Sequence, residues 1–172
     1  MAAKPARAPR LFFLYAHPCG DVLAKRGTIG KKDLASLRAR LASGKPFNAN
    51  PRMFEKAFGR LSAYAKRRGR RVSAALVREY FLSEHNRVVK KIAKSAKDVI
   101  PGRCFVTPCR IVSVKGASAL AETPHGKKKI NVRFVKGLRK GDFVSAHYFT
   151  ACEKIPRGAL ERMRREFHGR SR

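Results

Sequence analysis

The spacing of hydrophobic residues changes once along the chain, at Pro101-Gly102, and this change separates two kinds of structure. Before it, apolar side chains recur every three or four residues, the period of an amphipathic helix. After it, short runs rich in β-branched residues alternate with turns, which is typical of short strands. The sequence therefore predicts an α+β protein with four parts: a basic disordered arm (1–10), a helical domain (11–100), a small β-barrel (101–158), and a basic C-terminal helix with a tail (159–172).

Cap and stop residues predict where the helices begin and end. A stripe of leucines over residues 34–41 predicts a short helix, with glycine as its stop. Asn50 can cap a second helix, which ends at Gly69, and Ser73 can cap a third that runs to about residue 86. We expect some helical character to continue over 87–97, until Pro101-Gly102 breaks it.

Five short strands are expected in the second part of the chain. We place them at residues 104–114, 117–122, 127–135, 143–148 and 151–155. In the third strand, Ile130, Val132 and Phe134 alternate with polar residues, so they should face the core together. So many short strands joined by tight turns favour a small closed barrel over a sandwich. A final basic helix is expected over 158–167.

The charge of the chain is strongly one-sided. Among 172 residues, 41 are Lys or Arg and 11 are Asp or Glu, which gives a net charge of +30. The excess is present in both halves, since residues 1–100 carry 24 basic and 6 acidic side chains and residues 101–172 carry 17 and 5. Exposed helices usually balance their charge with ion pairs between acidic and basic residues spaced i,i+4. This chain has too few acidic residues to form many such pairs. Self-repulsion on this scale suggests that a polyanion neutralises the protein.

Several classes of protein do not fit the sequence. No apolar run approaches the roughly 20 residues that span a bilayer, and the apolar stretch 11–16 is too short for the core of a secretory signal. Four cysteines do not suggest a disulfide framework, so we expect a cytoplasmic protein with no membrane partner. No phosphate-binding glycine loop and no catalytic constellation is recognisable. We therefore expect neither an enzyme nor a cofactor.

The basic residues favour RNA as the partner. They are distributed over a helix end, a hairpin, a loop and the last helix, which suggests a protein embedded in folded RNA. The sequence shows no zinc finger, leucine zipper or helix-turn-helix, the common motifs of DNA-binding proteins. We expect ribosomal RNA, with neighbouring ribosomal proteins as further partners, by analogy with small basic ribosomal proteins. The candidate RNA-binding residues are Lys66, Arg67, Arg68, Arg70, Arg71, Lys127, Lys128, Lys129, Arg133, Lys136, Arg139, Lys140, Arg162, Arg164 and Arg165. A DNA-compacting chromatin protein is a further alternative.

Aromatic residues in the barrel offer a second means of binding nucleic acid. OB-type barrels often bind single strands through positive grooves and stacking aromatic rings. Phe134, Phe143, Tyr148 and Phe149 are the candidates for stacking. The hydrophobic core is the more common place for such side chains, and we expect each of them there.

Two motifs in the second part resemble a known family. The run Cys104-Phe-Val-Thr-Pro-Cys-Arg-Ile-Val112 and the run Gly141-Asp-Phe-Val-Ser-Ala-His147 occur in register. Together they resemble the opening strand and the second signature of the HypC/HupF hydrogenase-maturation chaperones. The resemblance covers about residues 103–167 and implies an OB-like barrel.

The resemblance also implies an alternative function. In that family the barrel carries an iron dicyanide carbonyl unit to a [NiFe]-hydrogenase precursor, so Cys104 and His147 would ligate iron and the partners would be hydrogenase-maturation proteins. A Cys3His zinc site that adds Cys109 and Cys152 is also conceivable. Two residues five positions apart on a strand point to opposite faces, which argues against such a site. We expect Cys109 and Cys152 to be small buried hydrophobic residues.

Overall fold

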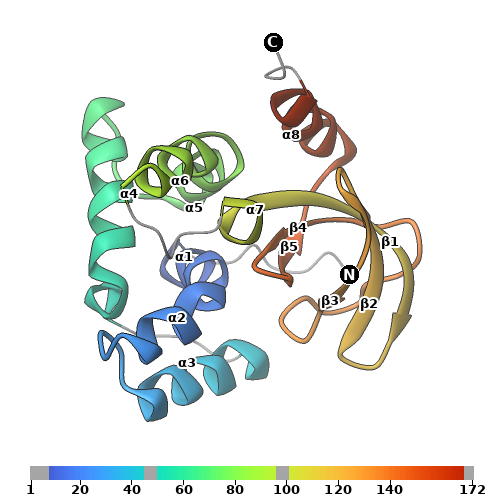
Figure 1. Cartoon of the computed structure of the whole chain (residues 1–172), viewed down its shortest axis with the longest axis horizontal. Coiled ribbons are helices and arrows are strands. Elements are labelled where there is room, and N and C mark those ends of the chain that lie inside the picture. The colour runs from blue at the N-terminus through green and yellow to red at the C-terminus, as the bar shows by residue number, and fades with distance from the viewer. Residues whose placement is uncertain (1–7, 45–49, 96–100, 169–172) are drawn as a thin grey trace. The chain divides into compact units, whose positions relative to one another are not determined.

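The computed structural model describes residues 8–44, 50–95 and 101–168 and confirms the α+β class, with helices first, then a five-stranded barrel and a last helix (Figure 1). The chain divides into two compact units, Met1–Tyr80 and Phe81–Arg172. This division precedes the change of hydrophobic pattern at Pro101. Most of the predicted basic arm, the end of the predicted helical domain and the C-terminal tail lie outside the described residues.

The first unit is built around a helix that is buried on all sides. In α1 (Ala8–Ala16), every residue from Leu11 to Ala16 is buried, and the helix contacts α3, α5 and the 3₁₀ turn η2. Such an apolar helix belongs in a core rather than at a surface. The other elements of the unit are η1 (His17–Cys19), α2 (Gly20–Lys25), α3 (Lys31–Ser43), η2 (Pro51–Phe54), α4 (Glu55–Arg67) and α5 (Ala74–Glu79).

The predicted caps are present in the first unit. Gly44 ends α3 with φ of 72°, in the left-handed region that glycine adopts easily. Ser73 accepts a hydrogen bond from the N–H of Leu76 and caps α5. Asn50 accepts one from the N–H of Arg52, but the turn that it caps is η2, and α4 begins only at Glu55. The predicted third helix is also interrupted, because the π-helical turn η3 (Tyr80–Glu84) separates α5 from α6 (His85–Ala93).

The barrel closes through its first strand, which pairs with two neighbours. Its strands are β1 (Val106–Lys115), β2 (Ser118–Thr123), β3 (Gly126–Asn131), β4 (Phe143–His147) and β5 (Thr150–Lys154). They follow the order β1-β2-β3-β5-β4, and β1 also pairs with β4 to close the ring. The β3–β5 pair is parallel and the others are antiparallel. This arrangement is compatible with a small OB-like barrel.

Two sequence expectations about the barrel are wrong in detail. The first strand is expected to begin at residue 104, but Pro101 begins the helical turn α7 (Pro101–Cys104), a position that suits proline, and β1 begins at Val106. Cys104 therefore lies in α7 and not in the opening strand. The third strand ends at Asn131, because its side chain accepts the N–H of Arg133 and turns the backbone. Ile130, Val132 and Phe134 are nevertheless buried, as the alternation predicts.

The barrel interior is filled by small and β-branched side chains. They are Cys109, Ile111, Ala119, Ala121, Ile130, Val132, Val144, Ala146 and Ala151. The last helix, α8 (Arg157–His168), contacts β1 and β4 and buries Ala159, Leu160 and Met163. Its charged residues thus lie on a helix that is anchored to the barrel.

The side chain of Asn86 in α6 holds the start of the barrel. Its amide donates to the carbonyl of Val106 at 2.9 Å and its oxygen accepts the N–H of Val106 at 2.8 Å. We expect Asn86→Ala to lower the free energy of unfolding by about 1–3 kcal/mol, because partly buried backbone groups lose these partners. Urea unfolding measures the change. Asn86→Asp keeps the acceptor and should lower the free energy of unfolding by less. A loss below about 0.5 kcal/mol in Asn86→Ala would show that the two hydrogen bonds to Val106 are dispensable.

Candidate nucleic-acid interface

The hairpin of β2 and β3 presents lysines to solvent. Lys127 and Lys129 are exposed and lie opposite Glu122 and Leu120 of β2. Between them, Lys128 lies opposite Ala121 and lines the mouth of the barrel beside Ile130, since successive residues of a strand point to opposite faces. The structure therefore separates Lys128 from the two lysines with which the sequence grouped it.

A second exposed basic segment follows β3. Lys136, Arg139 and Lys140 are exposed, as is Arg133. Asp142 organises this segment: its carboxylate accepts the backbone N–H of Arg139 at 2.7 Å and forms an ion pair with Lys154 at 2.8 Å. The hydrogen bond from Lys154 is the main cause that lowers the pKa of Asp142. We call the four exposed lysines of the hairpin and this segment the barrel lysines: Lys127, Lys129, Lys136 and Lys140.

The turn between β4 and β5 has an unusual backbone. Tyr148 and Phe149 are its two central residues, with φ of 48° and 62°. Two-residue hairpin turns with positive φ at both positions strongly prefer Asn-Gly, and the left-handed region costs about 1–2 kcal/mol for an ordinary residue. Phe149 is 43% exposed, which corrects the expectation of a core position. Phe134 is buried, and Phe143 and Tyr148 are half-buried.

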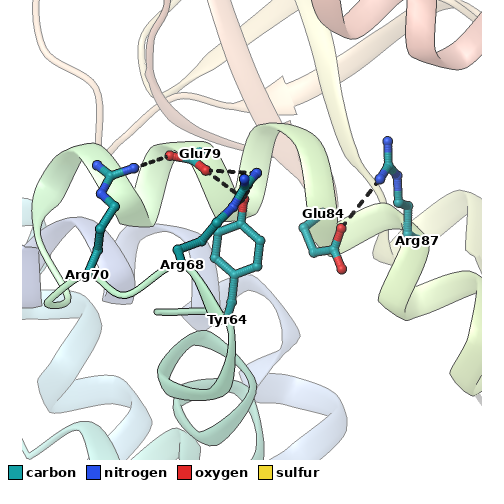
Figure 2. Close-up of polar contacts among 6 residues, drawn as sticks. All are labelled: Tyr64, Arg68, Arg70, Glu79, Glu84 and Arg87. Atoms are coloured by element: carbon teal, nitrogen blue, oxygen red, sulfur yellow. Dashed lines mark hydrogen bonds and ion pairs between the residues drawn. The ribbon is translucent and has the colours of Figure 1, made fainter. Parts of the chain in front are cut away.

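The basic cluster at the end of α4 is partly neutralised within the first unit. Figure 2 shows Arg68 and Arg70 directed at the carboxylate of Glu79, at 3.3 Å and 2.7 Å, and the hydroxyl of Tyr64 donating to the same carboxylate at 2.7 Å. The guanidinium of Arg67 lies 5.7 Å from the centre of the Tyr64 ring. Lys66 and Arg71 complete the cluster and are exposed. Three of its five cations, Arg67, Arg68 and Arg70, therefore have a partner within the unit. A separate ion pair in the figure joins Glu84 and Arg87.

This network predicts a specific loss of stability in acid. The hydrogen bond from Tyr64, followed by Arg70, lowers the pKa of Glu79 below its ordinary value. Ionised Glu79 therefore stabilises the fold above the pKa of the unfolded chain, and this contribution is lost as the pH falls through the lowered value. We expect Glu79→Gln to lower the free energy of unfolding by about 0.5–1 kcal/mol at pH 7 and to leave it almost unchanged near pH 2. Urea unfolding at both pH values tests this.

A conservative variant separates the hydrogen bond from the ion pairs. Tyr64→Phe keeps the ring but removes the hydroxyl donor, so it should show part of the same pH dependence. An equal cost of Glu79→Gln at both pH values would contradict the proposed role of the carboxylate.

The last helix carries its arginines on two sides. Arg162 and Arg165 are exposed, whereas Arg164 is half-buried. Arg164 lines a groove of about 290 Å³ between α8 and the barrel, together with Arg110 and Arg157. Sequence reasoning missed Arg110 and Arg157. The alternation of β1 could have indicated Arg110, because it lies between the buried Cys109 and Ile111 and must point outward.

The residues of the metal alternatives lie in different surroundings. His147 is 2% exposed, and its ring centre lies 5.0 Å from that of His85 in α6. Cys109 belongs to the barrel core, and burial raises the pKa of its thiol to about 12. Cys152 is also buried, at the irregularity in the pairing of β4 and β5, and is not among the side chains that fill the barrel. Within the described residues, no three His, Cys, Asp or Glu side chains are grouped to hold a metal ion. Iron ligation by Cys104 and His147 stays a prediction.

No protein-family model matches the chain, and no curated protein matches it. Over residues 8–44, 50–95 and 101–168, none of the helices combines the length and apolar character needed to cross a bilayer. The closed barrel implied by the HypC/HupF resemblance is present, while membership of that family stays a prediction.

Proposed function

We propose that the chain is an RNA-binding structural protein, a component of a ribonucleoprotein such as the ribosome. The observation that carries this proposal is the state of the barrel lysines. They are exposed and make no ion pair with any residue in the described part of the chain. A basic surface that the protein leaves without counter-charge is available to the phosphates of a nucleic acid.

Four of the scarce acids are engaged by other cations. Ion pairs join Asp21 to Arg38, Glu79 to Arg68 and Arg70, Asp142 to Lys154, and Glu161 to Arg157. None of these four carboxylates is paired with a barrel lysine, in a chain whose net charge is +30. Since repulsion among unpaired cations destabilises a compact state, an external polyanion would stabilise this one.

The variety of structural elements that carry these cations favours RNA binding over sequence-specific DNA binding. The exposed cations come from a strand, a loop and a helix of the second unit and from a helix end of the first. Sequence-reading DNA proteins instead place one helix or ribbon in a groove. Small OB-like barrels frequently bind RNA and single strands. Ribosomal RNA, with neighbouring ribosomal proteins as contacts, is the proposed setting.

Sedimentation of a cell lysate tests the proposal. The protein should travel with large ribonucleoprotein particles in a sucrose gradient and move to the top after RNase treatment, and the purified protein should retain RNase-sensitive nucleic acid. A protein that sediments alone without RNase contradicts the proposal. Nucleic acid sensitive only to DNase would favour the chromatin alternative. Iron with cyanide and carbonyl infrared bands that vanish in Cys104→Ala would favour the hydrogenase-maturation alternative.

A further inference from the structure

The turn between β4 and β5 holds an aromatic ring in an unfavourable position. Phe149 adopts φ of 62°, which is a genuine outlier for a bulky residue, yet its side chain is 43% exposed. The backbone is held there, because the N–H of Asn131 in β3 donates to the carbonyl of Phe149 at 2.8 Å. Burial in a core does not explain why the turn carries an aromatic residue instead of glycine. Strained positions that persist in this way are concentrated at binding sites.

The surroundings of the ring suit a nucleotide. The ammonium of Lys128 lies 5.5 Å from the centre of the Phe149 ring, and the Tyr148 ring packs edge-on at 6.3 Å. Arg103 and His125 line the same shallow pocket at the mouth of the barrel and are exposed. An aromatic platform beside cations such as Lys128 and Arg103 is the combination by which proteins hold unpaired bases, whose phosphates follow the positive charge.

The size of the pocket decides where a ligand can lie. Its cavity is about 20 Å³, which is room for about one water molecule. A base therefore cannot enter the barrel and must lie against the outside of the ring. A paired base offers no free face to such a ring, whereas an unpaired base does.

We propose that Phe149 is a stacking platform for one unpaired base of RNA, with Lys128 beside it to neutralise a phosphate. This inference rests on the proposed RNA-binding function and deepens it by naming unpaired nucleotides as the part of the RNA that is bound. Stacking on one ring tolerates any base, so the site adds preference for single strands rather than for a sequence.

Replacing the ring by the residue that the turn prefers tests the proposal. Phe149→Gly should weaken binding of an oligouridine of about 12 nucleotides by about 5- to 160-fold, the loss expected for one stacked base. Its affinity for an RNA duplex of equal length and the slope of its salt dependence should not change, because no phosphate contact is removed. Fluorescence anisotropy measures all three quantities.

A stability measurement separates binding from a structural role. Because glycine relieves the positive φ, Phe149→Gly should unfold at the same temperature as the wild type or up to about 4–8 °C higher. Phe149→Trp should keep the affinity for oligouridine. Val114→Thr, which changes another exposed apolar side chain of the barrel, should not alter it.

The outcomes distinguish this site from the proposed function. Unchanged oligouridine binding by Phe149→Gly overturns the stacking site alone, as does a wild type that binds structured RNA but not oligouridine. A Phe149→Gly protein that loses binding together with a large drop in unfolding temperature also overturns it, since the ring would then be structural. A wild type that binds no RNA overturns both proposals.

Discussion

Binding to RNA is expected to weaken about 30- to 1000-fold when the four barrel lysines are changed together to glutamate. Each lysine that meets a phosphate at an exposed position contributes on the order of 0.5–1 kcal/mol, which sums to roughly 2–4 kcal/mol for four. The lysines are exposed and make no ion pair within the described residues, so their replacement removes no contact that holds the fold. The salt slope should fall by about 3–4 units, since each lost phosphate contact removes about 0.7–0.9.

A matched control separates local contacts from net charge. Lys31, Lys32, Lys56 and Arg60 are exposed cations of α3 and α4. Their reversal to glutamate changes the net charge equally, and we expect it to weaken binding by less than about fivefold, through the general field alone. Equal losses in the two variants would contradict a specific interface on the barrel. Unfolding of the barrel-lysine variant would show that these side chains have a structural role instead.

The cluster at the end of α4 is less suitable for this test. Arg68 and Arg70 hold Glu79, and reversing them would place like charges around a carboxylate that three donors now satisfy. Loss of binding in such a variant would mix RNA contacts with local unfolding. Lys66 and Arg71 are exposed and make no ion pair with a described residue, so they are the positions of the cluster to test.

The first unit should lose a large part of its stability when α1 loses one aromatic ring. Phe13 is 0% exposed, and its ring centre lies 5.3 Å from that of Phe12 and 5.9 Å from that of Phe54. We expect Phe13→Ala to lower the free energy of unfolding by about 3–5 kcal/mol, through lost burial and the cavity that remains. That is a large part of the roughly 5–15 kcal/mol that a typical domain has.

Hydrogen exchange measured by mass spectrometry locates this effect. Amides of α1, α4 and α5 should exchange faster in Phe13→Ala. Phe58→Ala is the matched control, because Phe58 also contacts Phe12, at 5.5 Å between ring centres, but is only half-buried. Phe58→Ala should lower the free energy of unfolding clearly less than Phe13→Ala does. A cost below about 1 kcal/mol for Phe13→Ala would contradict a core built around α1.

Much of the fold could be predicted because its signals are local. The leucine stripe of α3, the glycine stop at Gly44 and the Ser73 cap each depend on a few neighbouring residues. The alternation of Ile130, Val132 and Phe134 correctly identified three buried residues, although β3 ends at Asn131. The end of β3 was missed because the side chain of Asn131 outweighs the strand propensity of the residues that follow it.

The candidate site could be predicted only in part, because it depends on contacts between distant residues. Composition identified the cations but not their partners, so the engagement of Arg68 and Arg70 by Glu79 was not foreseen. Phe149 was assigned to the core since aromatic residues are usually buried. Its exposure follows from the register of β4 and β5, which places it in a two-residue turn. The groove with Arg110 and Arg157 likewise exists only because α8 folds back on β1.

The dependence of RNA affinity on salt tests the central claim most directly. The association constant for a structured RNA should be measured between about 50 and 200 mM monovalent salt and plotted on logarithmic axes. If roughly 6–10 phosphates are neutralised by the basic surface, the affinity falls by about 10³–10⁵ over this range. A nearly flat plot, or no binding at the lowest salt concentration, would contradict an RNA-binding function for the uncompensated positive charge.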